Sequence, residues 1–401
     1  MNICIFEDFF ITRIHPVNHL RHTSEIICGA VTLIDKIKHY LKPKSITLYS
    51  RNYLAEYLRE KYPKYRVNEF QKSNCLFINS RAVLTKELAK KISGKNKSAI
   101  WFKNDDVIAI NASGKILEKV NVIFAENAAV LNDFRNIDIE KYEIKDDIRI
   151  INYPSDLVLF QKEEIYNDLK NIFKLKKVYV SPKCKISKQS IIDTSSGPVF
   201  IGENTVIEPF CYIKGPVYIG RNCIIKSGTT IYGPVTIGDY CKVSGEITNS
   251  TLHSYVNKQH LGFLGHSYLC EWVNLGAGTS TSNLKNNYSE IILKIGSNSI
   301  NTKSSFLGSI IGDHTKTGIN TMLNTGTLAG ISCNMFGNGY HNKIIKSFSW
   351  ADASSDSNVI YELEKALHTS KVSMNRRGAE MSNAYEKMFK FVYNNRDNID
   401  I

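Results

Sequence analysis

The sequence contains no run of eighteen apolar residues, so we expect no transmembrane helix. Its first residues lack the basic segment and the apolar stretch of a secretory signal, so we expect a protein that stays in the cytoplasm. Nine cysteines occur among the 401 residues, but no two of them stand in a Cys-x-x-Cys pair. This pattern is typical of a reduced protein, and it predicts no metal site.

Charge of one sign is in excess, because the formal net charge is +13. Such a charge attracts anions, for example sugar phosphates, nucleotides, coenzyme A or nucleic acid. However, lysine is abundant along the whole chain, and no basic cluster is dense enough to form a nucleic-acid-binding stripe. We therefore attribute most of the charge to overall composition and expect no nucleic-acid partner.

The clearest positive signal is a strict period of six. Aliphatic residues recur at this spacing over 201–243, and a small or slim residue follows most of them by four positions. The aliphatic positions are Ile201, Ile207, Ile213, Ile219, Ile225, Ile231, Ile237 and Val243. A six-residue repeat is typical of a parallel β-helix, in which three hexapeptides form one triangular coil. Coils then stack at the strand spacing of ~4.8 Å, with the aliphatic residues inside.

The same spacing extends upstream to Val180 and resumes between Phe263 and Met335. Two interruptions, near 245–262 and 280–306, are expected to be loops on one face of the solenoid. Strand and helix patterns alternate before the repeat, which indicates an α/β layer domain. Two amphipathic helices, Asn358–His368 and Asn383–Tyr393, are expected after it, capping the solenoid or packing on a neighbouring subunit. The predicted organisation is an α/β domain over 1–175, a β-helix over 176–350 and a helical tail over 351–401.

Three motifs carry a family resemblance. The segments 257–269 (NKQHLGFLGHSYL), 273–279 (VNLGAGT) and 283–288 (NLKNNY) resemble the acetyltransferase half of the bifunctional N-acetylglucosamine-1-phosphate uridyltransferase and glucosamine-1-phosphate N-acetyltransferase family. Segments 311–318, 323–327 and 347–350 are similar to a divergent branch of sugar nucleotidyltransferases within it. The resemblance spans nearly the whole chain. It implies a left-handed β-helix, a nucleotidyltransferase-like N-terminal domain and a homotrimer.

The resemblance also implies site residues in the β-helix. Acetyl transfer to an amine needs a base, and a histidine suits this role because its pKa lies near neutrality. His266 matches the family's catalytic histidine. The matching positions for the sugar phosphate are Lys258, Tyr268, Asn283 and Lys285, and small residues that would admit acetyl-CoA are Gly276, Ala277, Gly326 and Ala329. The competing interpretations are a polar loop surface for the former set and ordinary coil corners for the latter.

In the N-terminal domain, the resemblance implies a glycine-rich phosphate loop after the first strand, but this chain has no glycine between Phe6 and Arg13. Arg13, Arg21 and Arg81 remain as candidate phosphate-binding residues. Nucleotidyl transfer would require Mg²⁺ held by a carboxylate, and Asn79 stands in the matching position. We therefore expect binding without turnover in this domain.

Three functions stay open at this point. The first is an acetyl-CoA-dependent N-acetyltransferase that acts on an amino-sugar phosphate in sugar-nucleotide or envelope polysaccharide synthesis. The second is a sugar-1-phosphate nucleotidyltransferase whose β-helix only trimerises it. The third is a non-catalytic sugar-nucleotide-binding scaffold, which the missing glycine-rich loop favours over the second.

Overall fold

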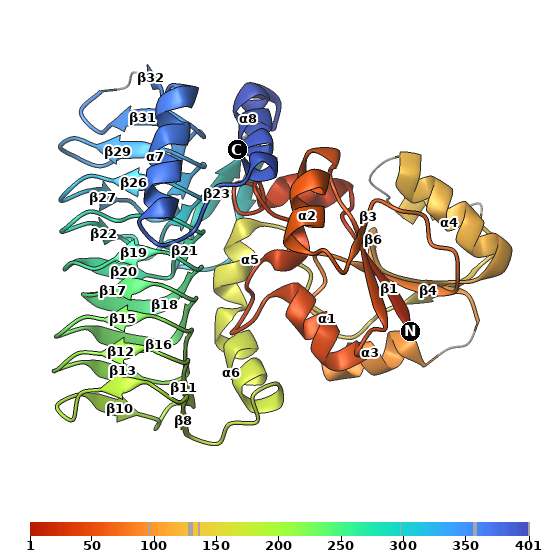
Figure 1. Ribbon diagram of the computed structural model, residues 1–401, viewed down its shortest axis with the longest axis horizontal. Helices are drawn as coiled ribbons and strands as arrows, with labels where there is room; N and C mark the ends of the chain where they lie inside the picture. Colours follow the sequence, from red (N-terminus) through yellow and green to blue (C-terminus); the bar gives the residue numbers. More distant parts are fainter. Residues whose placement is uncertain (95–96, 127–130, 135–136, 297, 356–358, 400–401) are drawn as a thin grey trace.

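The computed structural model describes residues 1–94, 97–126, 131–134, 137–296, 298–355 and 359–399. A long stack of short strands forms one side of the molecule, and an α/β layer domain forms the other (Figure 1). Helices α5 (Pro154–Leu159) and α6 (Gln161–Asn171) lie between them, and the C-terminal helices α7 (Leu363–Asn375) and α8 (Asn383–Asn394) lie near the upper end of the stack. No helix in the described residues is long and apolar enough to cross a membrane.

The α/β domain is built on a seven-stranded mixed sheet of order β3-β2-β1-β4-β6-β5-β7. Its strands are β1 Asn2–Phe6, β2 Ser45–Tyr49, β3 Arg66–Val67, β4 Cys75–Asn79, β5 Ala99–Lys103, β6 Asp106–Ala112 and β7 Glu140–Glu143. β6 runs antiparallel to β4 and β5, and the other pairs are parallel. The α/β layer domain predicted from the alternating strand and helix patterns is thus confirmed.

Helices cover both faces of this sheet. They are α1 Leu33–Leu41, α2 Ala55–Lys61, α3 Lys86–Ser93 and α4 Gly114–Glu126, followed by α5 Pro154–Leu159 and α6 Gln161–Asn171. Side chains alternate across a strand, so Ile3 and Ile5 join the core with α1, α2 and α3, whereas Cys4 and Phe6 join the core with α4. The carboxyl ends of β1, β2 and β4 therefore meet at one edge, where the candidate phosphate residues follow.

The β-helix has three faces of parallel strands, which we name A, B and C. Face A contains β8 Val178–Val180, β11 Val199–Ile201, β14 Val217–Ile219, the second halves of β16 Thr230–Ile237 and β18 Glu246–Leu252, β21 Tyr268–Leu269, β25 Ile310–Ile311, β28 Leu328–Ala329 and β30 Ile344–Ile345. Face B contains β9 Lys185–Ile186, β12 Val206–Ile207, β15 Ile224–Ile225, β17 Lys242–Val243, β19 Asn257–Lys258, β26 Lys316–Thr317, β29 Asn334–Phe336 and β31 Ser349–Asp352. Face C contains β10 Ile191–Asp193, β13 Tyr212–Lys214, the first halves of β16 and β18, β20 Phe263–Gly265, β22 Ser280–Thr281 and β27 Met322–Leu323.

The residues on the six-residue spacing fill the interior, as predicted. All eight positions over 201–243 are buried in one core cluster, together with the slim residues Cys211, Cys223, Cys241 and Cys333. The expected interruption at 245–262 is wrong, because β18 and β19 continue the coils there in register with β16 and β17. Connections between strands in this coil contain fewer residues than those in the preceding coils. The six-residue spacing is therefore lost, although the β-helix continues.

The second interruption does project from the solenoid. It contains an antiparallel hairpin of β23 Ile292–Ile295 and β24 Asn298–Asn301. Ile291, Leu293 and Ile295 are buried in a cluster that includes Ile14, Val17 and other residues of the N-terminal domain. The insertion therefore ties the two domains together.

The tail differs from the expectation. Residue 358 lies outside the described residues, β32 occupies Val359–Ile360, and α7 begins only at Leu363 and ends at Asn375. α8, Asn383–Asn394, packs on α2 of the same chain and on the 3-10 helix before it, Asn52–Leu54, where the Tyr53 and Phe391 rings stack at 4.6 Å. A short α9, Arg396–Ile399, follows. The tail thus joins the β-helix to the α/β domain within one chain.

Candidate functional site

The predicted catalytic histidine lies at the corner between faces C and A, directly after β20. The Asn283 side-chain nitrogen lies 2.8 Å from His266 Nδ1, and the Phe306 ring stacks on the imidazole at 4.9 Å between ring centres. Phe306 belongs to the insertion that interrupts the repeat. The structure therefore brings His266 into contact with Asn283, two site residues that the family resemblance implied.

The His266 imidazole is half-buried, and burial lowers its pKa to about 4. The ring is consequently neutral at pH 7, which a general base requires. Its backbone is left-handed, with φ of 48°, but Trp272 and His314 share this conformation at other corners. The unusual φ is therefore a property of β-helix corners and does not by itself mark a catalytic residue.

The orientation of the Asn283 amide decides which ring nitrogen carries the proton. If the amide nitrogen donates to Nδ1, the proton lies on Nε2, and no ring lone pair is free. If the amide oxygen accepts from Nδ1–H, the Nε2 lone pair is free to accept a proton. The two amide orientations occupy the same space, and only the second allows His266 to act as a base through Nε2.

Two residues expected to contact the sugar phosphate are instead buried. Tyr268 is fully buried; its hydroxyl donates to the Ile27 carbonyl at 2.9 Å and lies 2.7 Å from His253 Nε2. Lys258 occupies the inward position that pairs with Val243, and its Nζ donates to the His260 carbonyl at 2.8 Å. In this chain, Tyr268 joins the two domains and Lys258 fills the interior, so neither side chain is presented to a ligand.

Lys285 lies two residues after Asn283, the residue that contacts His266. Its Nζ donates to the Glu290 carbonyl at 2.7 Å and to Ser289 Oγ at 3.2 Å. These are contacts within an exposed loop. Lys285 therefore remains available to a ligand at modest cost.

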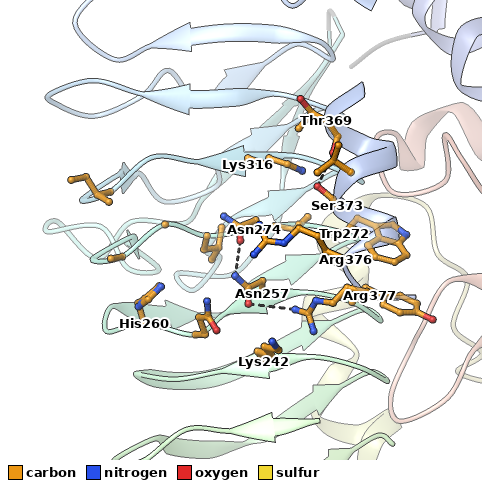
Figure 2. Close-up of a pocket in the computed structure, with 18 of the residues that line it drawn as sticks. Lys242, Asn257, His260, Trp272, Asn274, Lys316, Thr369, Ser373, Arg376 and Arg377 are labelled. Carbon is orange, nitrogen blue, oxygen red and sulfur yellow. Dashed lines mark hydrogen bonds between the residues drawn. The ribbon is translucent and has the colours of Figure 1, made fainter. Parts of the chain in front are cut away.

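A hollow lies elsewhere, between face B and α7, and we name it the α7 pocket. It has a volume of about 680 Å³. Gly276 and Ala277 line it, as do Trp272, Lys316 and Arg376 (Figure 2). His266 is not among its lining residues, because the corner between C and A is opposite face B.

The four small residues predicted for acyl-CoA are thus divided. Gly276 and Ala277 line the α7 pocket, whereas Ala329 is buried in the β-helix interior and Gly326 does not line the pocket. A Cβ at Gly276 would lie 2.3 Å from the Gly318 carbonyl oxygen of the next coil. Coil stacking by itself therefore requires glycine at position 276.

Sequence reasoning missed the cations of this pocket. Lys242, Lys316, Arg376 and Arg377 line it together with His260 and His368, and no lining residue is acidic. Lys242 and Lys316 each stand one position before an inward residue, Val243 and Thr317. Their outward direction could have been read from the six-residue spacing. The covering helix could not, because nothing in the repeat locates α7.

In the α/β domain, Asn79 and Arg81 are fully buried. Arg81 Nε and Nη2 donate to the Asp8 carboxylate at 2.9 and 2.6 Å, and Nη2 also pairs with Asp106. The Asn79 amide donates to Asp8 at 2.7 Å and to the Val107 carbonyl at 2.8 Å. Both residues expected to meet a nucleotide are therefore occupied by internal partners.

These residues do not fit a Mg²⁺ site. The two carboxylates near Asn79, Asp8 and Asp106, share the Arg81 guanidinium, so a cation already stands between them. Within the described residues, no group of three or more His, Cys, Asp or Glu side chains could hold a metal ion.

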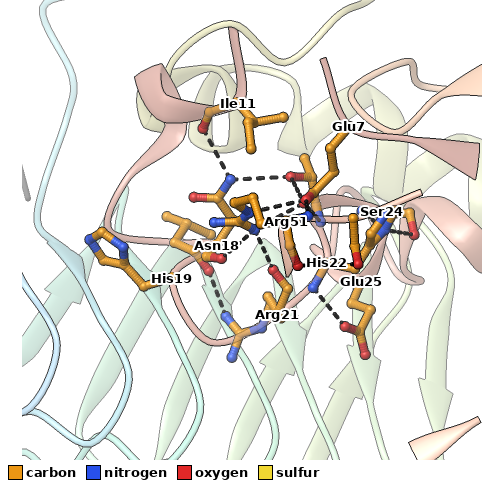
Figure 3. Close-up of polar contacts among 12 residues, drawn as sticks. Glu7, Ile11, Asn18, His19, Arg21, His22, Ser24, Glu25 and Arg51 are labelled. Atoms are coloured by element: carbon orange, nitrogen blue, oxygen red, sulfur yellow. Dashed lines mark hydrogen bonds and ion pairs between the residues drawn. The ribbon is translucent and has the colours of Figure 1, made fainter. Parts of the chain in front are cut away.

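Arg21 and Arg13 differ from each other. Arg21 is buried and pairs with Asp313 of the β-helix, whereas Arg13 is exposed, with its guanidinium 4.2 Å from the centre of the Phe10 ring. A buried network surrounds the segment that carries Arg21 (Figure 3). In it, the Arg51 guanidinium donates to the Glu7 carboxylate at 2.9 and 3.0 Å. Of the four predicted phosphate residues, only Arg13 is therefore free to bind an anion.

Comparison with known families identifies both parts of the chain. Residues 3–177 match the family described as sugar nucleotidyl transferase, and residues 198–233 match bacterial transferase hexapeptide (six repeats). The chain therefore combines a nucleotidyltransferase-like α/β domain with a C-terminal hexapeptide-repeat β-helix, as the sequence predicted. Both are transferase families.

A curated relative is the bifunctional sugar-1-phosphate nucleotidylyltransferase/acetyltransferase of Sulfurisphaera tokodaii, 33% identical over 87 residues. That match spans only 22% of either protein. Similar solved structures include the UDP-N-acetylglucosamine acyltransferase of Francisella novicida, with 16% identity, TM-score 0.30 and coverage of 55% of this chain and 78% of the other. Another is AntD, an N-acyltransferase from Bacillus cereus in complex with dTDP and 3-hydroxybutyryl-CoA, with 14% identity, TM-score 0.26 and coverage of 52% and 96%.

Proposed function

We propose that this protein is an acetyl-CoA-dependent N-acetyltransferase that acts on an amino-sugar phosphate in sugar-nucleotide synthesis in the cytoplasm. The observation that carries the proposal is the contact between His266 and Asn283, made by a neutral and half-buried imidazole. The name of the Sulfurisphaera tokodaii relative, which includes acetyltransferase activity, supports the reaction class.

In the proposed reaction, the Asn283 amide oxygen accepts a hydrogen bond from His266 Nδ1–H, so the Nε2 lone pair is free to act as the base. Nε2 takes a proton from the substrate amine as the amine nitrogen attacks the thioester carbonyl. The carbon–sulfur bond of the resulting tetrahedral intermediate then breaks, and the imidazolium returns its proton to the departing thiolate. The products are the amide and free coenzyme A, so no other reactant is needed.

We further propose that the site is completed by a neighbouring subunit of a trimer. The α7 pocket lies on face B and His266 at the opposite corner, so one chain does not place the base beside the pocket. Face A is covered by the α/β domain, whereas face C carries exposed apolar side chains such as Ile191 and Tyr232. An uncovered apolar face of this kind suits contact with a second copy.

The test is release of coenzyme A thiol from acetyl-CoA with glucosamine 1-phosphate as acceptor. His266→Ala should lower kcat/KM by on the order of 10²–10⁴-fold, while the half-buried His39→Ala control in the α/β domain leaves it unchanged. Equal size-exclusion profiles would show that both variants fold. A His266→Ala variant as fast as the wild type would refute the role of this base.

A mixing experiment tests the shared site. His266→Ala and a Lys316→Gln/Arg376→Gln variant should each be weak alone, and should regain activity after unfolding and refolding together. Light scattering should give three times the mass of the 45.4 kDa chain. A monomeric mass with full activity, or no regain on mixing, would exclude an intersubunit site.

We assign the α/β domain a scaffold role. Its phosphate candidates Arg21, Asn79 and Arg81 are occupied by Asp8, Asp313 and neighbouring groups. The measurement is pyrophosphate release from nucleoside triphosphates with sugar 1-phosphates and Mg²⁺, which should stay at background. Robust release that Arg13→Ala abolishes would instead support the nucleotidyltransferase alternative.

A further inference from the structure

The α7 pocket has a polar floor supplied by one column of outward side chains on face B. Strand register aligns Lys242, Asn257, Asn274 and Lys316 on successive coils. Asn257 donates to Asn274 at 2.6 Å, which fixes the two amides between the two lysines. Three coil steps of ~4.8 Å separate the lysines, so the floor is roughly 14 Å long.

The end of α7 forms the opposite wall. Arg376 caps the helix and Arg377 follows it; Arg377 donates to the Tyr240 carbonyl at 3.3 Å and to Asn257 at 3.5 Å. The guanidinium of Arg376 extends over the floor (Figure 2). Both arginines are held by the same chain that forms the floor, so this cationic site is complete in a single subunit.

The four cations of the pocket are not neutralised by any carboxylate that the structure describes. Within the described part of the chain, Lys242, Lys316, Arg376 and Arg377 form no ion pair with any carboxylate. The C-terminus of α7 supplies only about half a negative charge, which cannot balance four positive ones. Arg377 and burial lower the pKa of Lys242, and burial lowers that of Lys316 to about 8. The four positive charges therefore repel one another, and a bound polyanion would relieve this repulsion.

We infer that the α7 pocket binds a nucleotide that carries at least two phosphoryl groups, held by Lys242, Lys316, Arg376 and Arg377. Guanidinium groups pair with phosphate through two parallel hydrogen bonds, and lysines add point charge. A volume of about 680 Å³ is of the size that small-molecule sites have. Coenzyme A and a uridine nucleotide both have this chemistry. The inference rests on the proposed function only in naming coenzyme A as one source.

The test is isothermal titration of the full-length protein with coenzyme A, UDP, inorganic pyrophosphate and adenosine, each at two salt concentrations. We expect the three phosphorylated ligands to bind, adenosine not to bind, and high salt to weaken binding. Tighter binding of coenzyme A than of UDP would identify coenzyme A as the source, and the reverse order would identify a uridine nucleotide. Absence of binding by all three would overturn the inference.

A matched pair of variants locates the site. Lys242→Gln/Arg376→Gln removes two charges that make no side-chain hydrogen bond, and it should weaken binding at least tenfold for each charge removed. Lys185→Gln/Lys188→Gln is the control, because Lys185 stands in the same outward column three coils before Lys242 but lies away from α7. Without ligand, the first variant should also melt at a higher temperature than the wild type. Equal affinities of the two variants would place the ligand elsewhere.

The outcome is separable from that of the acetyltransferase proposal. His266→Ala should retain full affinity for coenzyme A or UDP, because His266 lies outside the pocket. Binding with no acetyl transfer by the wild type would refute the proposed reaction and leave this site standing. Acetyl transfer with unchanged affinity in Lys242→Gln/Arg376→Gln would do the opposite.

Discussion

Arg21 Nη2 donates a hydrogen bond to Asp313 Oδ1 across 292 sequence positions and across the boundary between the two domains. Both side chains are almost completely buried, and the same Asp313 oxygen accepts the Glu271 backbone N–H at 2.9 Å. The Arg21 guanidinium, which was expected to bind a ligand phosphate, therefore binds a carboxylate of the β-helix and links the two domains.

Arg21→Ala should destabilise the protein by about 3–5 kcal/mol, because it leaves the Asp313 carboxylate buried without a counter-charge. Arg21→Met/Asp313→Leu should restore most of that loss, since an apolar pair avoids the desolvation of both charges. Urea unfolding at pH 7 measures both. Lys183→Ala serves as control, because it breaks the exposed pair with Glu203, and a similar small loss in Arg21→Ala would contradict the prediction.

Glu7 should make stability acid-sensitive. Burial raises the pKa of this carboxyl, but the Arg51 guanidinium outweighs it and holds the pKa at about 2 in the folded state. The ionised form therefore contributes about 3 kcal/mol above pH 4.5. This contribution is lost as the pH falls from 4.5 towards 2.

The measurement is urea unfolding of the wild type and Glu7→Gln between pH 7 and pH 2.5. The variant should be less stable at pH 7, and the difference should shrink as the pH falls. Glu203→Gln, at an exposed ion pair, should show little difference at any pH. A Glu7→Gln deficit that does not change with pH would show that Glu7 acts through packing alone.

Lys258→Met should raise stability at pH 7 by about 1–3 kcal/mol, because burial lowers the pKa of this inward lysine to about 8 and penalises its charge. In the wild type, stability should rise with pH between 8 and 10.5, where only the unfolded chain still holds the proton. Lys316 titrates in the same range, so the variant should keep a shallower slope. Thermal unfolding at several pH values measures this, with Lys188→Met as the exposed control; a stability loss would contradict it.

The pH profile of acetyl transfer should lack an inflection near 6.5. The His266 base is neutral above its pKa of about 4, so kcat at saturating acceptor should show no loss from protonation of this base down to about pH 5. Asn283→Asp should move this acid limb upward, since a carboxylate accepts a hydrogen bond from Nδ1–H and its negative charge stabilises the imidazolium. Asn286→Asp, at an exposed position in the same loop, should leave it in place. An unmoved limb in Asn283→Asp would mean that Asn283 does not orient the ring.

The β-helix could be predicted because its interior repeats one environment. Each inward position packs against the equivalent position one coil away, as Ile201 does against Ile219. The same residue type is therefore needed in each coil, and the repeat is visible in the sequence. Lys258 is an exception to this repeat of apolar inward residues. A lysine can occupy an inward position when its amine donates a hydrogen bond to a backbone carbonyl. Hydrophobic spacing cannot foresee such an exception.

Charged candidates were harder to assign. A sequence shows that Arg21 and Arg81 carry charge, but not whether the partner is a ligand or a carboxylate elsewhere in the chain, as Asp313 and Asp8 are. For Arg376 and Arg377, the sequence predicts only a position in a helical tail and does not indicate a role in a pocket. Their importance follows from face B lying beneath α7, which is a tertiary relationship.

The contacts between the domains also limit how the chain length can change. The α/β domain forms hydrogen bonds with face A on separate coils. Thr236 donates to the Gly29 carbonyl at 2.7 Å, and Tyr268, two coils further on, donates to the Ile27 carbonyl. Arg21 then reaches Asp313, which lies in the next coil just after β25. Inserting or deleting a coil between Thr236 and Asp313 would displace one of these interdomain contacts relative to the others by ~4.8 Å. The solenoid can therefore lengthen or shorten at its ends, but its middle is locked to a fixed number of turns by a domain that is not part of the repeat.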